Sequence, residues 1–204
     1  MQKWLLSFAL LFSVSAWANV TDLTSLQQQL SQHPVVRGDF TQQRHLDMFN
    51  QPLRSSGHFT LSKMHGLLWQ QDTPFPVNLV LTENKLRQTF ADQEPKTISA
   101  KDNPMAFYFS RIFLSVFHGD TTALKTQFSL DFSADKGQWR LVLVPKQPPL
   151  NAVFKSIVLS GNEHIDNLTL QELRGDKTDI EFSHQTSIPQ ELTDAEDAQF
   201  RFSF

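Results

Sequence analysis

The stretch Gly57–Gln71, with the sequence GHFTLSKMHGLLWQQ, decides the fold class. Its apolar residues recur at every second position, at Phe59 and Leu61 and again at Leu67 and Trp69. A period of two is typical of a β-strand with one apolar and one polar face. We therefore predict two successive strands, Gly57–Lys63 and Gly66–Gln71. In the second strand the alternation places Leu68 on the polar face.

The same period continues on both sides of this stretch. It predicts further strands at Val36–Arg44, Val77–Thr82, Lys85–Phe90, Phe128–Phe132, Gln138–Val144, Val153–Ser160, Asn167–Leu173, Thr178–His184 and Ala198–Phe204. About eleven short strands joined by turns are typical of an antiparallel sheet that curls or closes. A sheet with one dry face must cover that face with other elements.

Two helices are candidates for this cover. Thr21–His33 has Leu23, Leu26 and Leu30 on one face and is followed by Pro34, which predicts an amphipathic helix. A short helix is also expected at Asp120–Gln127.

The segment Met105–Phe117 is apolar nearly all round. It follows Pro104, a residue that is favoured in the first turn of a helix, and it is too short to span a bilayer. Such a helix must be buried on most sides. Two interpretations remain open: a plain core helix, or a lid that fills the hollow of the sheet and is displaced by an apolar ligand.

Residues 1–18 have the pattern of a secretory signal peptide. Lys3 gives a basic start, Leu5–Val14 is the apolar region, and Ala16-Trp17-Ala18 is a small-residue cleavage site. We expect export, cleavage before Asn19, and a single domain over residues 19–204. No Cys follows the cleavage site, so the exported chain has no Cys to carry a lipid.

Composition excludes several classes of function. The 204 residues contain no Cys, which excludes disulfides, Cys-ligated metals and a thiol nucleophile, and the net charge of −3 argues against a nucleic-acid partner. The chain has 18 Phe and only 1 Tyr, as expected for a large dry interior. No nucleophile elbow, phosphate loop or dinucleotide motif occurs. The seven His are scattered, without metal-ligand spacing, at His33, His45, His58, His65, His118, His164 and His184. We expect no catalytic residues, no metal and no cofactor.

Several segments, in order, resemble the bacterial periplasmic outer-membrane lipoprotein carrier family of LolA type. They are Gly38-Asp39-Phe40-Thr41-Gln42-Gln43, Ser56–Leu61, Gly66–Trp69 followed by Thr73-Pro74, Trp139–Lys146, Ile157–Glu172 and Thr178–Phe182. The resemblance implies a mainly β fold with helices (α+β): a curved, half-open antiparallel β-barrel of about eleven strands, closed by an N-terminal helix and a helical lid. It also implies an apolar cavity that carries acyl chains.

Two differences indicate a divergent branch of that family. Lys63-Met64 stands where carriers have Arg-Pro, whose Arg helps to hold the lid shut, and the chain ends at Phe204 without the carriers' tail. We expect Lys63 at the mouth of the cavity. The expected wall and lid residues are Phe40, Phe59, Leu61, Leu67, Trp69, Leu79, Phe107, Phe109, Ile112, Phe113, Phe117 and Leu141.

The resemblance implies a monomeric periplasmic carrier of an acylated lipoprotein or another lipid. An inner-membrane exporter would supply the cargo and an outer-membrane acceptor would receive it. Two alternatives remain: a ligand-sensing regulatory protein of the same fold, and a secreted lipid hydrolase. The hydrolase lacks any recognisable nucleophile motif, so we do not expect an enzyme.

Overall fold

One antiparallel sheet dominates the computed structural model of the chain, which describes residues 20–91, 93–102, 107, 111, 114–115 and 120–201. The expected signal peptide, residues 1–18, lies outside these residues. The strands are β1 (Val35–His45), β2 (Leu53–Ser62), β3 (Gly66–Thr73), β4 (Val77–Leu81), β5 (Lys85–Phe90), β6 (Lys96–Ser99), β7 (Phe128–Asp135), β8 (Gln138–Pro145), β9 (Phe154–Gly161), β10 (Ile165–Glu172) and β11 (Lys177–Thr186). The helices are α1 (Leu23–Ser31), α3 (Thr121–Gln127), α4 (Asp194–Phe200) and the 3₁₀ turn η1 (Leu150–Ala152).

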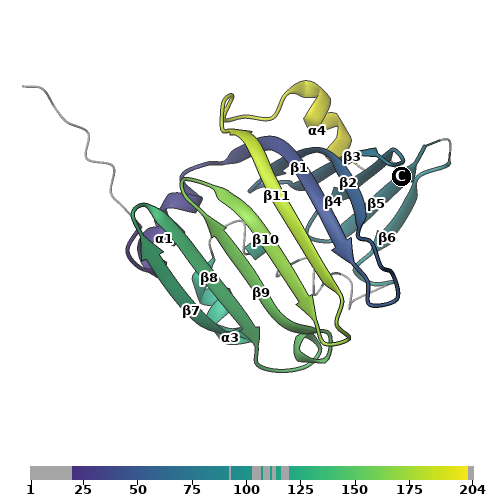
Figure 1. Cartoon of the computed structure of the whole chain (residues 1–204). Coiled ribbons are helices and arrows are strands. Elements are labelled where there is room, and N and C mark those ends of the chain that lie inside the picture. Colours follow the sequence, from purple (N-terminus) through teal and green to yellow (C-terminus); the bar gives the residue numbers. More distant parts are fainter. Residues whose placement is uncertain are drawn as a thin grey trace, which may run out of the picture.

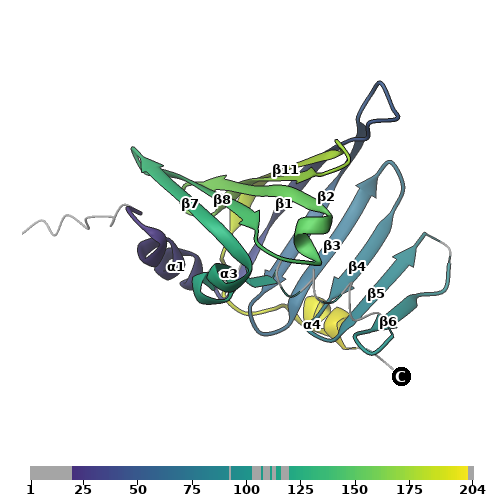
Figure 2. The same cartoon turned by 90° about the horizontal axis from the view of Figure 1, so that it is seen from below.

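The strand order makes the sheet an open arch. It runs β6-β5-β4-β3-β2-β1-β11-β10-β9-β8-β7, so β1 pairs with β11 in the middle. Strands β6 and β7 form the two edges and do not pair with each other. Figure 2 shows the resulting curvature, with α1 and α3 side by side near β7. The predicted curved, half-open α+β fold is therefore confirmed.

The inner face of the arch holds the main core. Helix α1 is capped by Asp22, whose side chain accepts a hydrogen bond from the backbone N–H of Ser25 at 2.8 Å, and it buries Leu26 in this core. Leu124 of α3 and Leu150 of η1 join the same cluster. The hydroxyl of Thr121 donates to the Gln27 side chain at 2.6 Å and so links α3 to α1.

A second apolar cluster lies on the other face, where the alternation predicts solvent. Leu68 of β3, Val80 of β4 and Phe200 of α4 pack together there, and Leu68 is 0% exposed. Leu68 is thus on the predicted face but not in water, because α4 covers it. Figure 1 shows α4 at the top of the molecule near β1 and β3.

The predicted strand Ala198–Phe204 is wrong. Residues up to Phe200 belong to α4, and 202–204 lie outside the described part of the chain. The reason is local: Thr193 and Glu196 form a capping box in which each side chain binds the other residue's backbone N–H. The eleventh strand is instead β6, which the periodicity does not predict.

The expected helix Met105–Phe117 lies mostly outside the described residues. The four residues described within it, Phe107, Arg111, Leu114 and Ser115, are helical. Phe107 and Leu114 are buried, and Leu114 belongs to the main core. Within the described ranges, no helix is long and apolar enough to cross a bilayer.

Candidate functional site: the concave face of the sheet

An aromatic cluster lines the concave face. The rings of Phe40 and Trp69 are stacked, with centroids 3.6 Å apart and planes at 24°. Phe59 and Phe182 meet edge to face at 5.1 Å. These residues come from β1, β3, β2 and β11, so the cluster crosses the middle of the arch. Aromatic pairs in these two arrangements stabilise each other beyond their buried area.

Most of the predicted wall residues lie together in this core. Phe40, Phe59, Leu61, Leu67 and Leu141 are buried in one cluster, and the half-buried Trp69 and Leu79 pack against it. Phe107 is also buried. The remaining predicted residues, Phe109, Ile112, Phe113 and Phe117, lie outside the described residues.

A small crevice opens in the concave face at the end of α1. It encloses about 20 Å³, room for about one water molecule. It is lined by Leu30, His33, Val36, Phe59, Leu61, Lys63, His164, Ile165 and Gln185. The walls are thus mainly apolar, and in this conformation the side chains themselves fill most of the space.

A wider polar groove lies next to the crevice. It has a volume of about 320 Å³ and is lined by Lys63, Met64, His65, Gly66, Glu83, Arg111, Leu114 and Ser115. Lys63 lines both the groove and the crevice. This residue therefore stands at the boundary between an apolar and a polar compartment.

The Lys63 side chain is anchored to the end of α1. Its ammonium group donates a hydrogen bond to the carbonyl of Ser31, the last residue of the helix. Carbonyls in the last turn of a helix lack partners within the helix and attract cations. The backbone N–H of Lys63 also donates to the carbonyl of Pro34 at 3.0 Å. Partial burial lowers the pKa of the Lys63 ammonium group.

A family model shows what this architecture is. The model "Outer membrane lipoprotein carrier protein LolA" matches residues 31–203, most of the chain. The protein belongs to the LolA family. A comparison with curated protein sequences finds no match.

Solved structures similar to this LolA family member share little sequence with it. A LolA superfamily protein from Nitrosomonas europaea has 8% identity and a TM-score of 0.47, over 90% of this chain and 99% of that one. An outer membrane lipoprotein-sorting protein domain from Vibrio parahaemolyticus has 9% identity and a TM-score of 0.47, over 88% and 97%. A chain of the Pseudomonas aeruginosa MucA/MucB complex has 12% identity and a TM-score of 0.49, over 89% and 59%.

Lys63 stands where the resemblance implies a lid-holding Arg. The described partner of its ammonium group is the Ser31 carbonyl of α1, and Arg111, Leu114 and Ser115 of the expected lid line the same groove as Lys63. Phe59, Leu61 and Lys63 of the crevice are among the predicted site residues, whereas Leu30, His33, Val36, His164, Ile165 and Gln185 are not. Leu30 and Val36 have a sequence signal, since both lie in predicted amphipathic elements. His33 and His164 have none, because they come from distant parts of the chain.

Burial shifts the pKa values of two ionisable groups beside the crevice, His164 and Asp166. Desolvation, and then the neighbouring His33, lower the pKa of the His164 imidazole. Burial likewise raises the pKa of the Asp166 carboxyl. The neutral form of each group is therefore favoured relative to water, as expected at the margin of an apolar interior.

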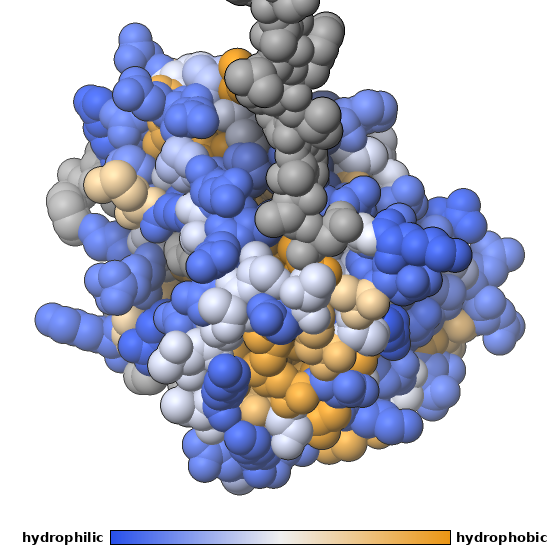
Figure 3. Space-filling model, turned by 90° about the vertical axis from the view of Figure 1, so that its left-hand side faces the viewer, coloured by the Kyte–Doolittle hydropathy of each residue, from blue (hydrophilic) through white to orange (hydrophobic). Residues whose placement is uncertain are grey.

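The apolar interior of this LolA fold reaches the surface beside β7. Figure 3 looks at the side that carries α1, α3 and β7 and shows an apolar patch surrounded by hydrophilic residues. On the edge strand β7, Leu130 and Phe132 are half-buried and pack against the inner core.

Proposed function

We propose that the protein is a periplasmic carrier that binds the acyl chains of a lipoprotein or another lipid against the concave face and shuttles them towards the outer membrane. Membership of the LolA family supports this proposal. The observation that carries it is the position of Lys63, between a mainly apolar crevice and a polar groove. An acylated molecule has the same two parts, a chain and a head group.

The closed crevice is consistent with reversible binding. Each methylene group that leaves water contributes about 0.8 kcal/mol, so a long acyl chain alone would bind too tightly to be released. Here the acyl chain of the ligand has to displace protein side chains, such as Phe59 and Leu61, that already pack together. The affinity is then the difference between two burial energies, which keeps transfer to an acceptor possible.

The groove favours an anionic head group. Among the described residues, the cations Lys63 and Arg111 line it together with His65 and one acid, Glu83. A carboxylate or phosphate next to the cations would be attracted, whereas a cationic head group would meet repulsion. We therefore propose that the cargo carries its negative charge close to the acyl chains.

The remaining parts of the proposal rest on the resemblance to carriers of this family. The carrier is a monomer, it is not an enzyme, and its signal peptide is removed on export. It receives its cargo from an inner-membrane exporter and delivers it to an outer-membrane acceptor. A sensor of the same fold would bind a similar ligand but would not transfer it.

The direct test is to identify the bound lipid. The protein is purified from the periplasm without detergent, extracted with organic solvent, and the extract is analysed by mass spectrometry. We expect an acylated, anionic species at a stoichiometry near one. An extract without lipid, from protein that also fails to take up an acylated lipopeptide, would overturn the proposal.

A matched pair of variants tests the role of Lys63. Lys63→Met should lower retention of an anionic acyl ligand, since it removes the charge and keeps the apolar stem. Lys155→Met changes an exposed Lys of β9 and should retain the ligand as the wild type does. Loaded protein that transfers cargo to acceptor membranes would favour the carrier, and loaded protein that never transfers would favour the sensor.

A further inference from the structure

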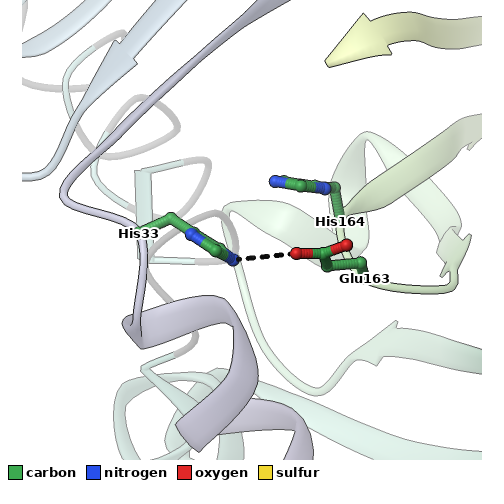
Figure 4. A group of neighbouring side chains, drawn as sticks. All are labelled: His33, Glu163 and His164. Carbon is green, nitrogen blue, oxygen red and sulfur yellow. Dashed lines mark ion pairs between the residues drawn. The ribbon is translucent and has the colours of Figure 1, made fainter. Parts of the chain in front are cut away.

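Two histidines and a glutamate from opposite ends of the chain meet beside the crevice. His33 follows α1, whereas Glu163 and His164 lie in the turn between β9 and β10. One ligand atom from each residue lies within 4.8 Å of the other two. The His33 Nε2 atom is 3.7 Å from a carboxylate oxygen of Glu163, as drawn in Figure 4. Figure 4 also shows the His164 ring reaching over the same space.

The imidazole rings are held close to each other. Their centroids are 4.8 Å apart, and their planes are inclined by only 24°. The side chain of His33 is 18% exposed, and that of Glu163 is 50% exposed. The two nitrogen ligands are thus confined, while the carboxylate is free to adjust its position.

Neighbouring residues fix both segments that carry the ligands. The Gln29 side chain of α1 donates to the carbonyl of Asn162 at 2.5 Å, and the Trp139 indole N–H donates to the same carbonyl at 2.8 Å. The Nε2 atom of His164 lies 3.2 Å from the hydroxyl oxygen of Ser187. A hydrogen bond from one ring nitrogen is the usual means by which a metal-binding His is oriented.

We propose that His33, Glu163 and His164 form a binding site for a divalent transition metal ion, with zinc as the best match. Two imidazoles and one carboxylate are a known three-ligand set for zinc, which then keeps a fourth position for water or another oxygen ligand. The set contains no thiolate, which disfavours Cu(I), and too few oxygens for calcium. The bound ion would clamp the end of α1 to the β9–β10 turn.

The geometry requires the three ligand atoms, which lie within 4.8 Å of one another, to draw together around the ion. Zinc–nitrogen and zinc–oxygen bonds of about 2.0–2.1 Å place ligand atoms of a tetrahedral site about 3.4 Å apart. The His33–Glu163 pair is already close to this separation. Spacing along the sequence gives no sign of such a site, because the fold alone brings residue 33 next to residues 163 and 164.

The test is a zinc titration of protein purified without a histidine tag and freed of metal with a chelator. Isothermal titration calorimetry should give one zinc site per chain, and zinc should raise the melting temperature. The variants His33→Ala and His164→Ala should lose both effects. Ser187→Ala should weaken zinc binding by about 10-fold, the loss expected when a partner that orients a metal ligand is removed.

Control variants distinguish loss of the zinc site from general effects on folding. His45→Ala removes a half-exposed His on β1, outside the cluster, and should bind zinc as the wild type does. Only the zinc-induced change is compared, so a variant that is less stable without metal remains informative. Zinc should also slow hydrogen exchange of the α1 amides in the wild type. The proposal would be overturned if the wild type failed to bind zinc. It would also be overturned if His33→Ala and His164→Ala bound zinc as tightly as the wild type does.

Discussion

The ring of Phe40 stacks on the ring of Trp69 although their strands are not neighbours. β2 lies between β1 and β3 in the sheet, and the ring centroids are nevertheless 3.6 Å apart. The β2 residue opposite Phe40 is Gly57. Gly57 also lies at a register shift between β2 and β3. Phe40 of the stack is thus paired with the glycine that borders this irregularity.

Gly57→Ala should therefore destabilise the fold. A Cβ atom at this position would overlap the backbone carbonyl oxygen of Gln70 in β3, which cannot move without disturbing the strand pairing. We expect a loss of about 1–3 kcal/mol or more in the free energy of unfolding, measured by urea denaturation. Ser129→Ala, at an exposed position of β7, should cost little. An unchanged denaturation midpoint for Gly57→Ala would contradict the tight packing of β2 against β3.

Loss of the Phe40 ring should also lower the free energy of unfolding. Phe40 is 1% exposed, and replacing a buried Phe by Ala costs about 3–5 kcal/mol. Phe75→Ala is the matched control, because Phe75 is 73% exposed and should lose no more than about 0.5 kcal/mol. Similar losses for the two variants in thermal and urea denaturation would show that Phe40 does not belong to the core.

The link between Arg37 and Glu196 should make stability depend on pH. The guanidinium group binds both carboxylate oxygens, at 2.6 and 2.7 Å, and also the carbonyls of Pro189 and Glu191, which holds α4 and its preceding loop against β1. The hydrogen bonds from Arg37 lower the pKa of Glu196 to about 2 from its ordinary 4.5. The charged carboxylate thus favours the folded state.

Because the pKa of Glu196 is lower in the folded state, the ion pair stabilises the protein at neutral pH and not in strong acid. The stabilisation is complete above about pH 4.5 and is lost as the pH falls towards about 2, and it amounts to about 2–3 kcal/mol. The free energies of unfolding of the wild type and of Glu196→Gln should therefore differ at about pH 6 and converge only as the pH approaches about 2. A difference that is the same at both values would rule out this ion pair as the cause.

The second apolar cluster, formed by Leu68, Val80 and Phe200, gives another test of the position of α4. Leu68→Ala should cost about 2–5 kcal/mol, because Leu68 is fully buried between β4 and α4. Leu53→Ala, which changes a half-exposed Leu of β2, should stay within about 0.5 kcal/mol. If Leu68→Ala unfolds at the same urea concentration as Leu53→Ala, α4 does not cover this face in solution.

The period-two pattern predicts the sheet because the apolar residues that alternate along each strand mark its buried face. Leu141 is an example, since it is buried in the inner core between the exposed Arg140 and the half-buried Val142. The same pattern fails at Leu68, because burial on the outer face depends on α4, which comes far later in the chain. The capping box of Thr193 and Glu196 was a local signal for that helix, whereas the aromatic alternation at Phe200 pointed to a strand.

The candidate site is predictable in part for the same reason. Phe59 and Leu61 belong to the dry face of one strand, so their pattern identifies them as wall residues. The contact of Lys63 with the end of α1 depends on the pairing of β1 with β2, and the meeting of His33 with His164 depends on β11 pairing with both β1 and β10. No local pattern encodes contacts between segments that are distant in the sequence.

Quenching of Trp69 fluorescence tests the central claim, that acyl chains bind against the concave face, most directly. A fatty acid with a spin label on its acyl chain is titrated into the wild type and into Trp69→Phe, and the free spin label without a chain serves as the control. Because Trp69 is half-buried on the concave face, the account predicts saturable quenching that is clearly larger in the wild type than in Trp69→Phe. Equal quenching of the two proteins, or quenching no greater than that by the free label, would contradict it.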